Sequence, residues 1–279
     1  MLLDFIMDNS NNQQQVLFID GSYFCFHRYH SLMNWWKNAH KDESLLNEET
    51  KELNPEFVEK FKKTFIQTVK TIPQKLGLKD PIIIVGKDCK RENIWRNEFI
   101  ENYKGTRIRD GFHGGPLFKA AYEEELFQKG GAVSILSHPK LEADDCIALS
   151  TKYLLKTNPN INITIITSDK DYLQLAGPRV QLFDLIFKNL CEQKSSLGDA
   201  KKNLFCKIVM GDVSDNISSV LTKCGPKTAI KCFENNEYFE ERLKKENAYS
   251  KYELNRKIID FDYIPTNLSD EFMHSIISF

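Results

Sequence analysis

The sequence lacks three features that would place the protein in a membrane or outside the cell. No apolar run reaches the roughly eighteen residues that a membrane-spanning helix needs. Residues 1–15 carry acids and amides where a secretory signal has basic residues and an apolar stretch. The seven cysteines include no Cys-x-x-Cys pair, so neither a disulfide framework nor a zinc site is indicated. We therefore expect an intracellular protein of the cytoplasm or nucleus, with reduced thiols and no membrane contact.

The chain also lacks a large net charge, since 38 basic and 39 acidic residues give a formal charge of −1, but its charges are unevenly distributed. Residues 87–109 hold seven Lys and Arg against four Asp and Glu, and residues 219–231 hold three lysines and no acid. Three carboxylates crowd into positions 142–145. Basic segments beside a cluster of acids indicate phosphate contacts that flank a metal site.

A hydrophobic share of 41% over 279 residues is enough to bury a core. Short apolar runs without strict alternation predict strands buried on both faces, at 16–19, 82–85, 132–136, 161–167 and 180–185. Helices are predicted between them, at 55–76, 92–104, 116–128 and 141–155. The alternation predicts an α/β fold with a mostly parallel central sheet flanked by helices. We expect a flexible leader over 1–15, a catalytic core over 16–200 and a helical region with the C-terminal tail over 201–279.

Acidic residues follow the predicted strands or begin the predicted helices: Asp20, Asp88, Glu142, Asp144, Asp145, Asp169, Asp171, Asp212 and Asp215. The carboxyl ends of parallel strands meet at one edge of a sheet, so these acids can converge there. Repulsion among them would need a cation, and two Mg²⁺ ions about 4 Å apart suit oxygen ligands and a phosphoryl displacement. Any one of these acids, taken alone, could simply be solvated or favoured by a helix dipole.

Six motifs resemble those of the 5′ nuclease superfamily, which comprises flap endonucleases, phage 5′–3′ exonucleases and the nuclease domain of bacterial DNA polymerase I. They also stand in the family's order along the chain. They are Phe18-Ile-Asp-Gly21, Trp95-Arg96 with Tyr103-Lys-Gly-Thr-Arg107, Leu141-Glu-Ala-Asp-Asp145, Thr167-Ser-Asp-Lys-Asp171, Gly211-Asp-Val-Ser-Asp-Asn216 and Gly225-Pro-Lys-Thr-Ala229. The resemblance implies a PIN-like nuclease core, a helix–hairpin–helix element and two divalent ions, Mg²⁺ with Mn²⁺ as a substitute.

Carried onto this chain, the resemblance distributes the acids between the two ions. The first ion would be surrounded by Asp20, Asp88, Glu142, Asp144 and Asp145. The second would be held or oriented by Asp169, Asp171, Asp212 and Asp215.

The basic segment is expected to be a helix over 92–108 with one face directed at the substrate. Helical spacing places Arg96, Tyr103, Lys104 and Arg107 within one third of its circumference. The resemblance makes Arg96 and Lys104 candidates for stabilising charge in the transition state. Tyr103 could stack on an exposed base, and Arg107 would contact DNA. The alternative is a solvated basic face with Tyr103 packed in the core.

Residues 208–235 resemble the family's helix–hairpin–helix element, in which Lys223, Lys227 and Lys231 would grip duplex phosphates without reading bases. The resemblance also implies K⁺ at the hairpin, a site that depends on a particular arrangement of carbonyl groups. Ser218-Ser-Val220 and Lys223-Cys-Gly225 depart from the family's pattern there. Residues 105–140, with glycines at both ends, are expected to form an arch over the 5′ strand or an ordinary crossover.

We therefore predict a metal-dependent, structure-selective 5′ nuclease acting in replication and repair. Its partners would be DNA with a 5′ flap or recessed 5′ end, and RNA–DNA hybrids at primers. The protein is expected to be a monomer without a sliding-clamp peptide and of phage or viral type. A PIN-type ribonuclease and a non-catalytic junction-binding module are the alternatives. The lysine-rich hairpin disfavours the first of these, and the acids beside a phosphate site disfavour the second.

Overall fold

The computed structural model describes residues 14–41, 44–47, 49–106 and 111–277. Its centre is a sheet of parallel strands in the order β3-β2-β1-β4-β5. The strands are β1 (Gln15–Asp20), β2 (Ile82–Gly86), β3 (Ala132–Leu136), β4 (Asn162–Ile166) and β5 (Val180–Phe183). The predicted α/β class and all five predicted strands are confirmed.

The central strand β1 shows why the apolar runs did not alternate. Val16 and Phe18 pack into the core on one face, Leu17 and Ile19 into the core on the other, and all four are fully buried. Because helices cover both faces, each residue of the strand gains from being apolar. The sheet therefore has two cores, one on each side.

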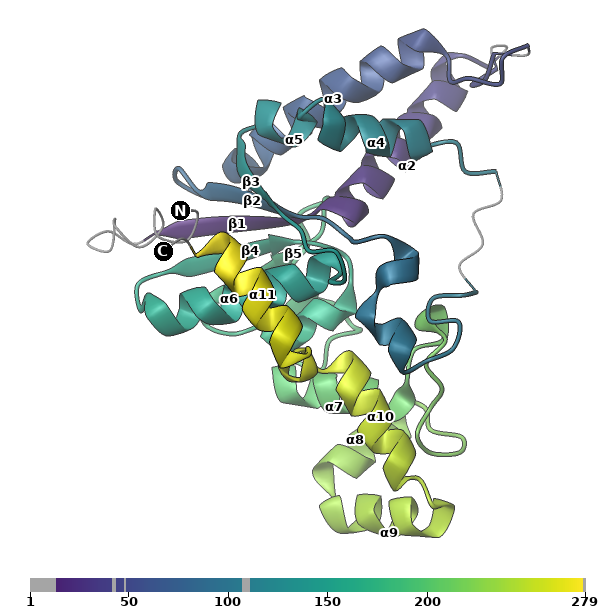
Figure 1. Ribbon diagram of the computed structural model, residues 1–279, viewed down its shortest axis with the longest axis vertical. Helices are drawn as coiled ribbons and strands as arrows, with labels where there is room; N and C mark the ends of the chain where they lie inside the picture. The colour runs from purple at the N-terminus through teal and green to yellow at the C-terminus, as the bar shows by residue number, and fades with distance from the viewer. Residues whose placement is uncertain (1–13, 42–43, 48, 107–110, 278–279) are drawn as a thin grey trace.

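One face of the sheet is covered by α2 (Gly21–Ala39), α3 (Pro55–Lys75), α4 (Gly115–Glu123) and α5 (Leu126–Lys129), as Figure 1 shows. The helix α3 begins at Pro55, and its preceding residue Asn54 accepts a hydrogen bond from the Glu56 N–H. Phenylalanines at four-residue steps, with Val69 one step further, form its buried stripe: Phe57, Phe61 and Phe65.

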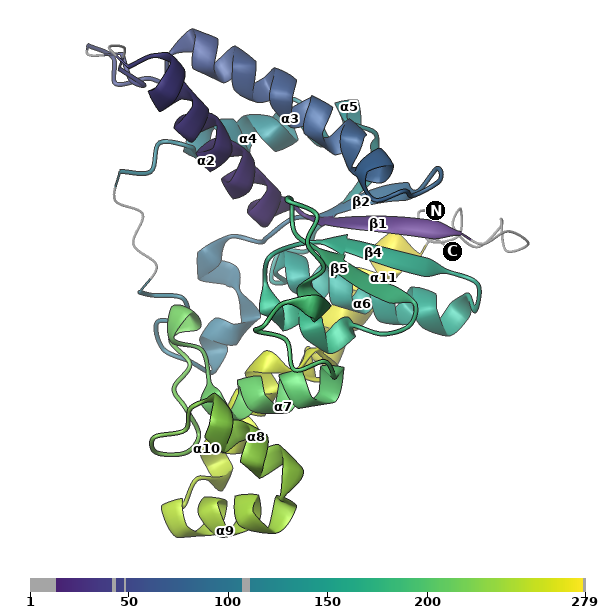
Figure 2. The same cartoon turned by 180° about the vertical axis from the view of Figure 1, so that it is seen from behind.

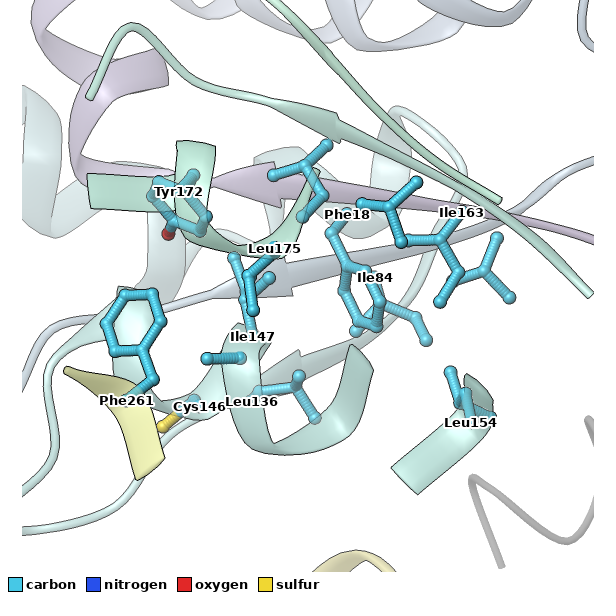
Figure 3. Packing of buried hydrophobic residues seen from close by; sticks show 14 of the residues in the cluster. Phe18, Ile84, Leu136, Cys146, Ile147, Leu154, Ile163, Tyr172, Leu175 and Phe261 are labelled. Atoms are coloured by element: carbon cyan, nitrogen blue, oxygen red, sulfur yellow. The ribbon is translucent and has the colours of Figure 1, made fainter. Parts of the chain in front are cut away.

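The other face is covered by α6 (Ala143–Thr157) and α11 (Thr266–Ile276). Figure 3 shows Phe18 and Ile84 from the sheet packed with Ile147 from α6. From α11, Leu268 and Phe272 enter the same core. The last helix of the described chain therefore returns to the sheet.

The remaining helices, α7 (Ala200–Met210), α8 (Pro226–Glu234), α9 (Asn236–Glu246) and α10 (Tyr249–Ile259), form a region beyond one end of the sheet (Figures 1 and 2). A loop over 211–225 joins α7 to α8, which gives the predicted helix–hairpin–helix arrangement. Short 3₁₀ turns complete the fold: η1 (Arg91–Asn93), η2 (Trp95–Glu98), η3 (Lys170–Leu175), η4 (Leu190–Glu192), η5 (Val213–Asp215) and η6 (Phe261–Tyr263).

The helix predicted over 92–108 is wrong. The chain forms η1 and η2 instead, with Ile94 extended between them, and Asn102 and Lys104 adopt left-handed backbone angles. The side chains of Trp95 and Arg96 both bond to Asp145, and this tertiary anchoring outweighs helical propensity.

The sequence reading missed α2, and it predicted one helix where α4 and α5 are separate. Gly21 begins α2 close to the β2 backbone, where an added Cβ would lie 2.5 Å from the Gly86 carbonyl oxygen. The side chain of Asp20 caps this helix by accepting the Tyr23 N–H at 3.0 Å. Between α4 and α5, Glu125 has a left-handed backbone that breaks the helix.

The predicted arch over 105–140 includes 107–110, which lie outside the described residues, and it stays a prediction. From Gly115 onward this segment packs on α3, with Leu117, Ala121 and Phe127 buried in the core. Within the described ranges, each helix is too short or too polar to cross a bilayer.

Candidate active site

The predicted site acids lie where the strand order reverses. The strands β1 and β4 are neighbours, but the chain leaves β1 toward β2 and reaches β4 only after β3. In open parallel sheets a crevice forms at such a reversal, outside the carboxyl ends of the strands. Asp20 ends β1, and Asp169 follows β4 by three residues. These two acids therefore lie on opposite sides of the crevice.

A cleft of about 300 Å³ occupies this position. It is lined by Asp20, Ser22, Tyr23, Phe26, Asp88, Lys104, Glu142, Ala143, Asp144, Ser168 and Asp169. Among the described residues, the lining joins five carboxylates from four places in the chain with one cation, the Lys104 ammonium. This excess of carboxylates favours cations over anions at the site.

Asp20 is held at the floor of the cleft by two hydrogen bonds. One oxygen accepts the Tyr23 N–H at 3.0 Å and the other accepts the Thr167 hydroxyl at 3.1 Å. Burial, reinforced by the negative charges of Asp88 and Asp169, raises the pKa of Asp20 to about 7. A divalent cation nearby would favour the charged form and so oppose this shift.

Asp88 links β2 to the start of α6. One of its oxygens accepts the Ala143 N–H at 2.8 Å, and the other accepts the Ser22 hydroxyl. The side chain faces the same cleft as Asp20. The structure thus brings the acid after the second strand into the cluster.

The start of α6 carries the densest group of acids. Oxygens of Glu142, Asp144 and Asp145 lie within 4.8 Å of one another. Glu142 and Asp145 form a capping box, in which each side chain accepts the other residue's backbone N–H. Burial and the charges of Asp145 and Glu142 raise the pKa of Asp144 well above its usual range. Because these carboxylates repel one another, the cluster needs cations on both of its sides to offset the repulsion.

Arg96 supplies the cation behind the cluster. Its side chain is 3% exposed and donates to both Asp145 oxygens at 2.7 and 2.8 Å, to Glu142 at 3.0 Å and to the Ile258 carbonyl at 2.9 Å. The prediction that Arg96 meets the substrate directly needs correction, because its donors are turned inward. It orients two carboxylates instead, and the Trp95 N–H helps by bonding Asp145 at 2.9 Å.

Tyr103 and Lys104 join the two groups of acids. The Tyr103 hydroxyl lies 3.3 Å from a Glu142 oxygen and 3.2 Å from an Asp215 oxygen. Its ring is 5% exposed, so the base-stacking role predicted for it is wrong and the core-packing alternative describes it better. Lys104 pairs with Glu142 and faces the cleft. Arg107, the fourth predicted residue of this segment, lies outside the described residues.

Two of the remaining acids contact a lysine that was not predicted as a site residue from the sequence. Lys207, in the last turn of α7, contacts Asp171 and lies 2.6 Å from an Asp212 oxygen. Burial and the charge of Asp169 raise the pKa of Asp171 to about 6. Burial acts in the same direction on Asp212, but hydrogen bonds from Lys207 and Ser214 lower its pKa to about 2. This second group of acids is already paired with a cation.

The three predicted lysines of the hairpin region are exposed. Lys223 precedes α8, Lys227 lies in its first turn, and Lys231 follows one turn later with its ammonium 3.8 Å from the Tyr238 ring centroid. They lie on the loop–helix unit, and none of them lines the cleft.

Sequence reasoning missed Lys207, Ser22 and Thr167 because it searched for acids and basic clusters. Lys207 stands one helical turn before Gly211-Asp212, and that spacing could have marked it as a partner of Asp212. Ser22 and Thr167 lie beside Asp20 and Ser168-Asp169 in the motifs, and hydroxyls near carboxylates commonly donate to them.

Comparison with known proteins gives this site a family context. The family described as 5′–3′ exonuclease, N-terminal resolvase-like domain, matches residues 15–204. The ribonuclease H of Enterobacteria phage T4 is 28% identical over 214 residues, which is 69% of this chain and 68% of that protein. A DNA polymerase I of Lactococcus lactis is 32% identical over 154 residues, half of this chain but 16% of the polymerase.

Solved structures share the fold. The structure of the T5 D15 protein co-crystallised with metal ions matches over 94% of this chain and 98% of its own, with a TM-score of 0.63 and 16% identity. A T5 flap endonuclease in a pseudo-enzyme-product complex with DNA and metal ions has a TM-score of 0.62, with 15% identity over the same shares of the two chains. At such identities, the likeness supports the architecture.

Proposed function

Since the chain belongs to the family of 5′–3′ exonuclease N-terminal, resolvase-like domains, and is thereby a 5′ nuclease acting on DNA, we propose that it is a divalent-metal-dependent, structure-selective enzyme. It hydrolyses phosphodiester bonds near 5′ ends at flaps, nicks and RNA primers. The observation that carries this proposal is the cleft lined by five carboxylates from four places in the chain, at the point where the strand order reverses.

The donor set of the cleft fits hard divalent cations, which prefer oxygen ligands. We assign Asp20, Asp88, Glu142 and Asp144 to a first ion, with Asp145 behind them on Arg96. The raised pKa of Asp20 supports this, because its causes, burial and the charges of Asp88 and Asp169, are those that a bound cation would offset. Two divalent ions would supply Lewis acidity for an attacking water and for the leaving oxygen.

A second ion is assigned to Asp169, Asp171, Asp212 and Asp215. Asp171 and Asp212 both face Lys207, and Asp215 faces Tyr103 and Lys104. Lys207 therefore offsets the charge of Asp171 and Asp212 when the ion is absent. Asp169, which also faces the cleft, stands between the two groups.

The side chains of this protein position the substrate. Lys104 is the cation within the cleft, so it is placed to bind the scissile phosphate and stabilise the charge that develops on it. Arg96 keeps Glu142 and Asp145 in fixed orientations. Tyr23 and Phe26 on α2 add an aromatic wall to the cleft, suited to stacking on a base near the cut bond.

The hairpin region is the proposed duplex grip. Lys223, Lys227 and Lys231 are exposed along the loop and the first turns of α8, where backbone N–H groups and lysines can contact phosphates. Such contacts read the backbone, so we expect weak sequence preference and strong salt dependence. The enzyme would therefore recognise the junction between a duplex and a 5′ single strand.

The proposal is tested with a flap duplex labelled on its 5′ arm. The purified protein should release the arm in Mg²⁺ or Mn²⁺ and should stop in EDTA. An intact flap at high enzyme concentration with either metal would refute the proposal. Lys104→Met should cut far more slowly, whereas Asp270→Ala, an exposed acid on α11, should match the natural protein.

A further inference from the structure

The loop between α7 and α8 is held from outside by side chains of later helices. Asn255 of α10 is 2% exposed, and its amide donates to the Ile208 carbonyl at 3.0 Å and to the Ser218 carbonyl at 2.9 Å. Because both acceptors are backbone groups, this amide fixes the distance between Ile208, near the end of α7, and Ser218 in the loop.

A second contact comes from α9. The Glu246 carboxylate accepts the Thr222 N–H at 2.7 Å and the Thr222 hydroxyl at 2.6 Å. The Arg242 guanidinium donates to Glu246 at 2.6 Å and to the Thr222 carbonyl at 3.1 Å. Thr222 is thus held through its N–H, its hydroxyl and its carbonyl. We call Arg242, Glu246 and Thr222 together the Arg242 clasp.

The clasp also reaches α8. Arg242 donates to the Tyr238 hydroxyl at 3.1 Å, and the ammonium of Lys231 lies over the Tyr238 ring. Hydrogen bonds from the Thr222 hydroxyl and N–H, together with Arg242, lower the pKa of Glu246 to about 2. The carboxylate therefore stays ionised throughout the range in which the enzyme would work.

A K⁺ ion in such a hairpin would need several carbonyl oxygens free to replace its water shell. In this loop the carbonyls of Ser218 and Thr222 already accept from Asn255 and Arg242. The Leu221 carbonyl lies 2.9 Å from the Ser219 hydroxyl. Two carbonyls of this loop thus accept from side-chain nitrogens, and a third lies beside a hydroxyl. The full positive charge of Arg242 lies at the Thr222 carbonyl, and its repulsion disfavours K⁺ at this place.

We propose that Arg242 is the built-in cation of the hairpin, so that the duplex grip is pre-organised without K⁺. This inference rests on the proposed function, since it concerns how the same hairpin binds a duplex. Arg242 is a positioning residue: it acts on the DNA through Thr222 and the neighbouring Lys223, and Glu246 keeps the guanidinium in place.

The first test measures binding of the full chain to a flap duplex, with Ca²⁺ replacing Mg²⁺ to slow cutting, in KCl, LiCl and tetramethylammonium chloride at equal ionic strength. We expect dissociation constants within about twofold of one another, because no site discriminates the cations. Binding that K⁺ tightens tenfold over both other cations would overturn the inference. A protein that neither binds nor cuts the flap in any of the salts would instead refute the proposed function.

The second test compares Arg242→Gln with Lys245→Gln, an exposed residue of the same helix that loses the same charge. Arg242→Gln should weaken binding to the flap duplex by about tenfold, because the loop must then be ordered on binding. Lys245→Gln should change it by less than about twofold. The cutting rate of Lys245→Gln with enzyme in saturating excess should be unchanged, since the carboxylate cleft is untouched.

Two further comparisons separate positioning from folding. Arg242→Lys, which keeps a cation, should recover part of the lost affinity. Hydrogen exchange at residues 217–225 should accelerate in Arg242→Gln, whereas exchange in β1 should not. Equal binding by Arg242→Gln and Lys245→Gln would overturn the inference. Should Arg242→Gln fail to fold, the salt comparison on the natural protein still decides the question.

Discussion

At the scale of single residues, the pKa of Asp20 shows the effect of burying several carboxylates in one cleft. Its pKa rises to about 7 because of burial and the charges of Asp88 and Asp169. The folded protein therefore favours the protonated form, whereas the unfolded chain releases this proton near pH 4. The contribution to stability is complete below about pH 4 and is lost as the pH rises through about 7.

We therefore predict that the metal-free protein loses stability between about pH 4 and pH 7, by up to about 1.4 kcal/mol per pH unit. Urea unfolding in EDTA at several pH values measures this. Asp20→Asn should reduce the slope but not remove it, because Asp171, with a pKa of about 6, titrates in the same window. An unchanged slope in Asp20→Asn would contradict the assignment. Mg²⁺ should stabilise the natural protein more at pH 8 than at pH 5, since ligands must be deprotonated.

A substitution at Asp171 should affect cutting of the substrate but not its binding. Asp171→Ala should slow cutting by roughly 100-fold or more, because a metal ligand supplies several kcal/mol of transition-state stabilisation. Binding to the flap duplex should survive, because the hairpin lysines are distant from this carboxylate in the sequence and on other elements. Single-turnover cutting and equilibrium binding measure the two effects, with Asp270→Ala as the control. Unchanged cutting would remove Asp171 from the metal site.

At the scale of elements, α8 presents the exposed lysines of the proposed duplex grip. Lys227→Glu should weaken binding to a duplex-containing substrate about tenfold or more and reduce the salt dependence, while binding to a free single strand changes less. Lys244→Glu on α9 has the same charge change at another exposed position and serves as the control. Equal losses on both substrates would show that α8 is not the duplex grip.

The elements that the sequence predicted well are those whose signals are local. The strand β1 is a run of apolar residues, and α3 repeats phenylalanine at four-residue steps, so burial and periodicity are visible in the letters. The start of α6 was also predictable, because Glu142 and Asp145 stand at the spacing of a capping box.

The elements that the sequence hid depend on contacts distant in the chain. Trp95 and Arg96 are compatible with a helix in the sequence. Their partner Asp145 stands some fifty positions later, and the hydrogen bonds to it replace the helix with short turns. The start of α2 is set by Gly21 passing close to β2, which no local pattern records. Tyr103 was open to either interpretation, and only the packing around it decided the outcome.

At the scale of the whole molecule, the chain returns to its core after the helical region. Phe272 of α11 is fully buried against the sheet side that α6 covers. A second cluster, which includes Tyr103, Ile208 and Ile258, joins the helical region to the segment after β2. The two regions therefore share packed surfaces at two places, and we expect them to unfold together.

Phe272→Ala should lower the free energy of unfolding by about 3–5 kcal/mol, because it leaves a cavity in the core. Urea unfolding followed by tryptophan fluorescence and by far-UV circular dichroism should give coincident transitions in both proteins. Asp270→Ala, two residues away and exposed, should stay within about 0.5 kcal/mol of the natural protein. Two separated transitions would mean that the helical region unfolds on its own.

The pairing of Lys207 with Asp171 and Asp212 has a consequence for how ions enter this protein. If a divalent cation binds Asp171 and Asp212 as proposed, it would have to compete with the ammonium of Lys207, so loading would exchange one counter-ion for another. The exchange would release the lysine from these two carboxylates. The freed lysine would then be available to a phosphate.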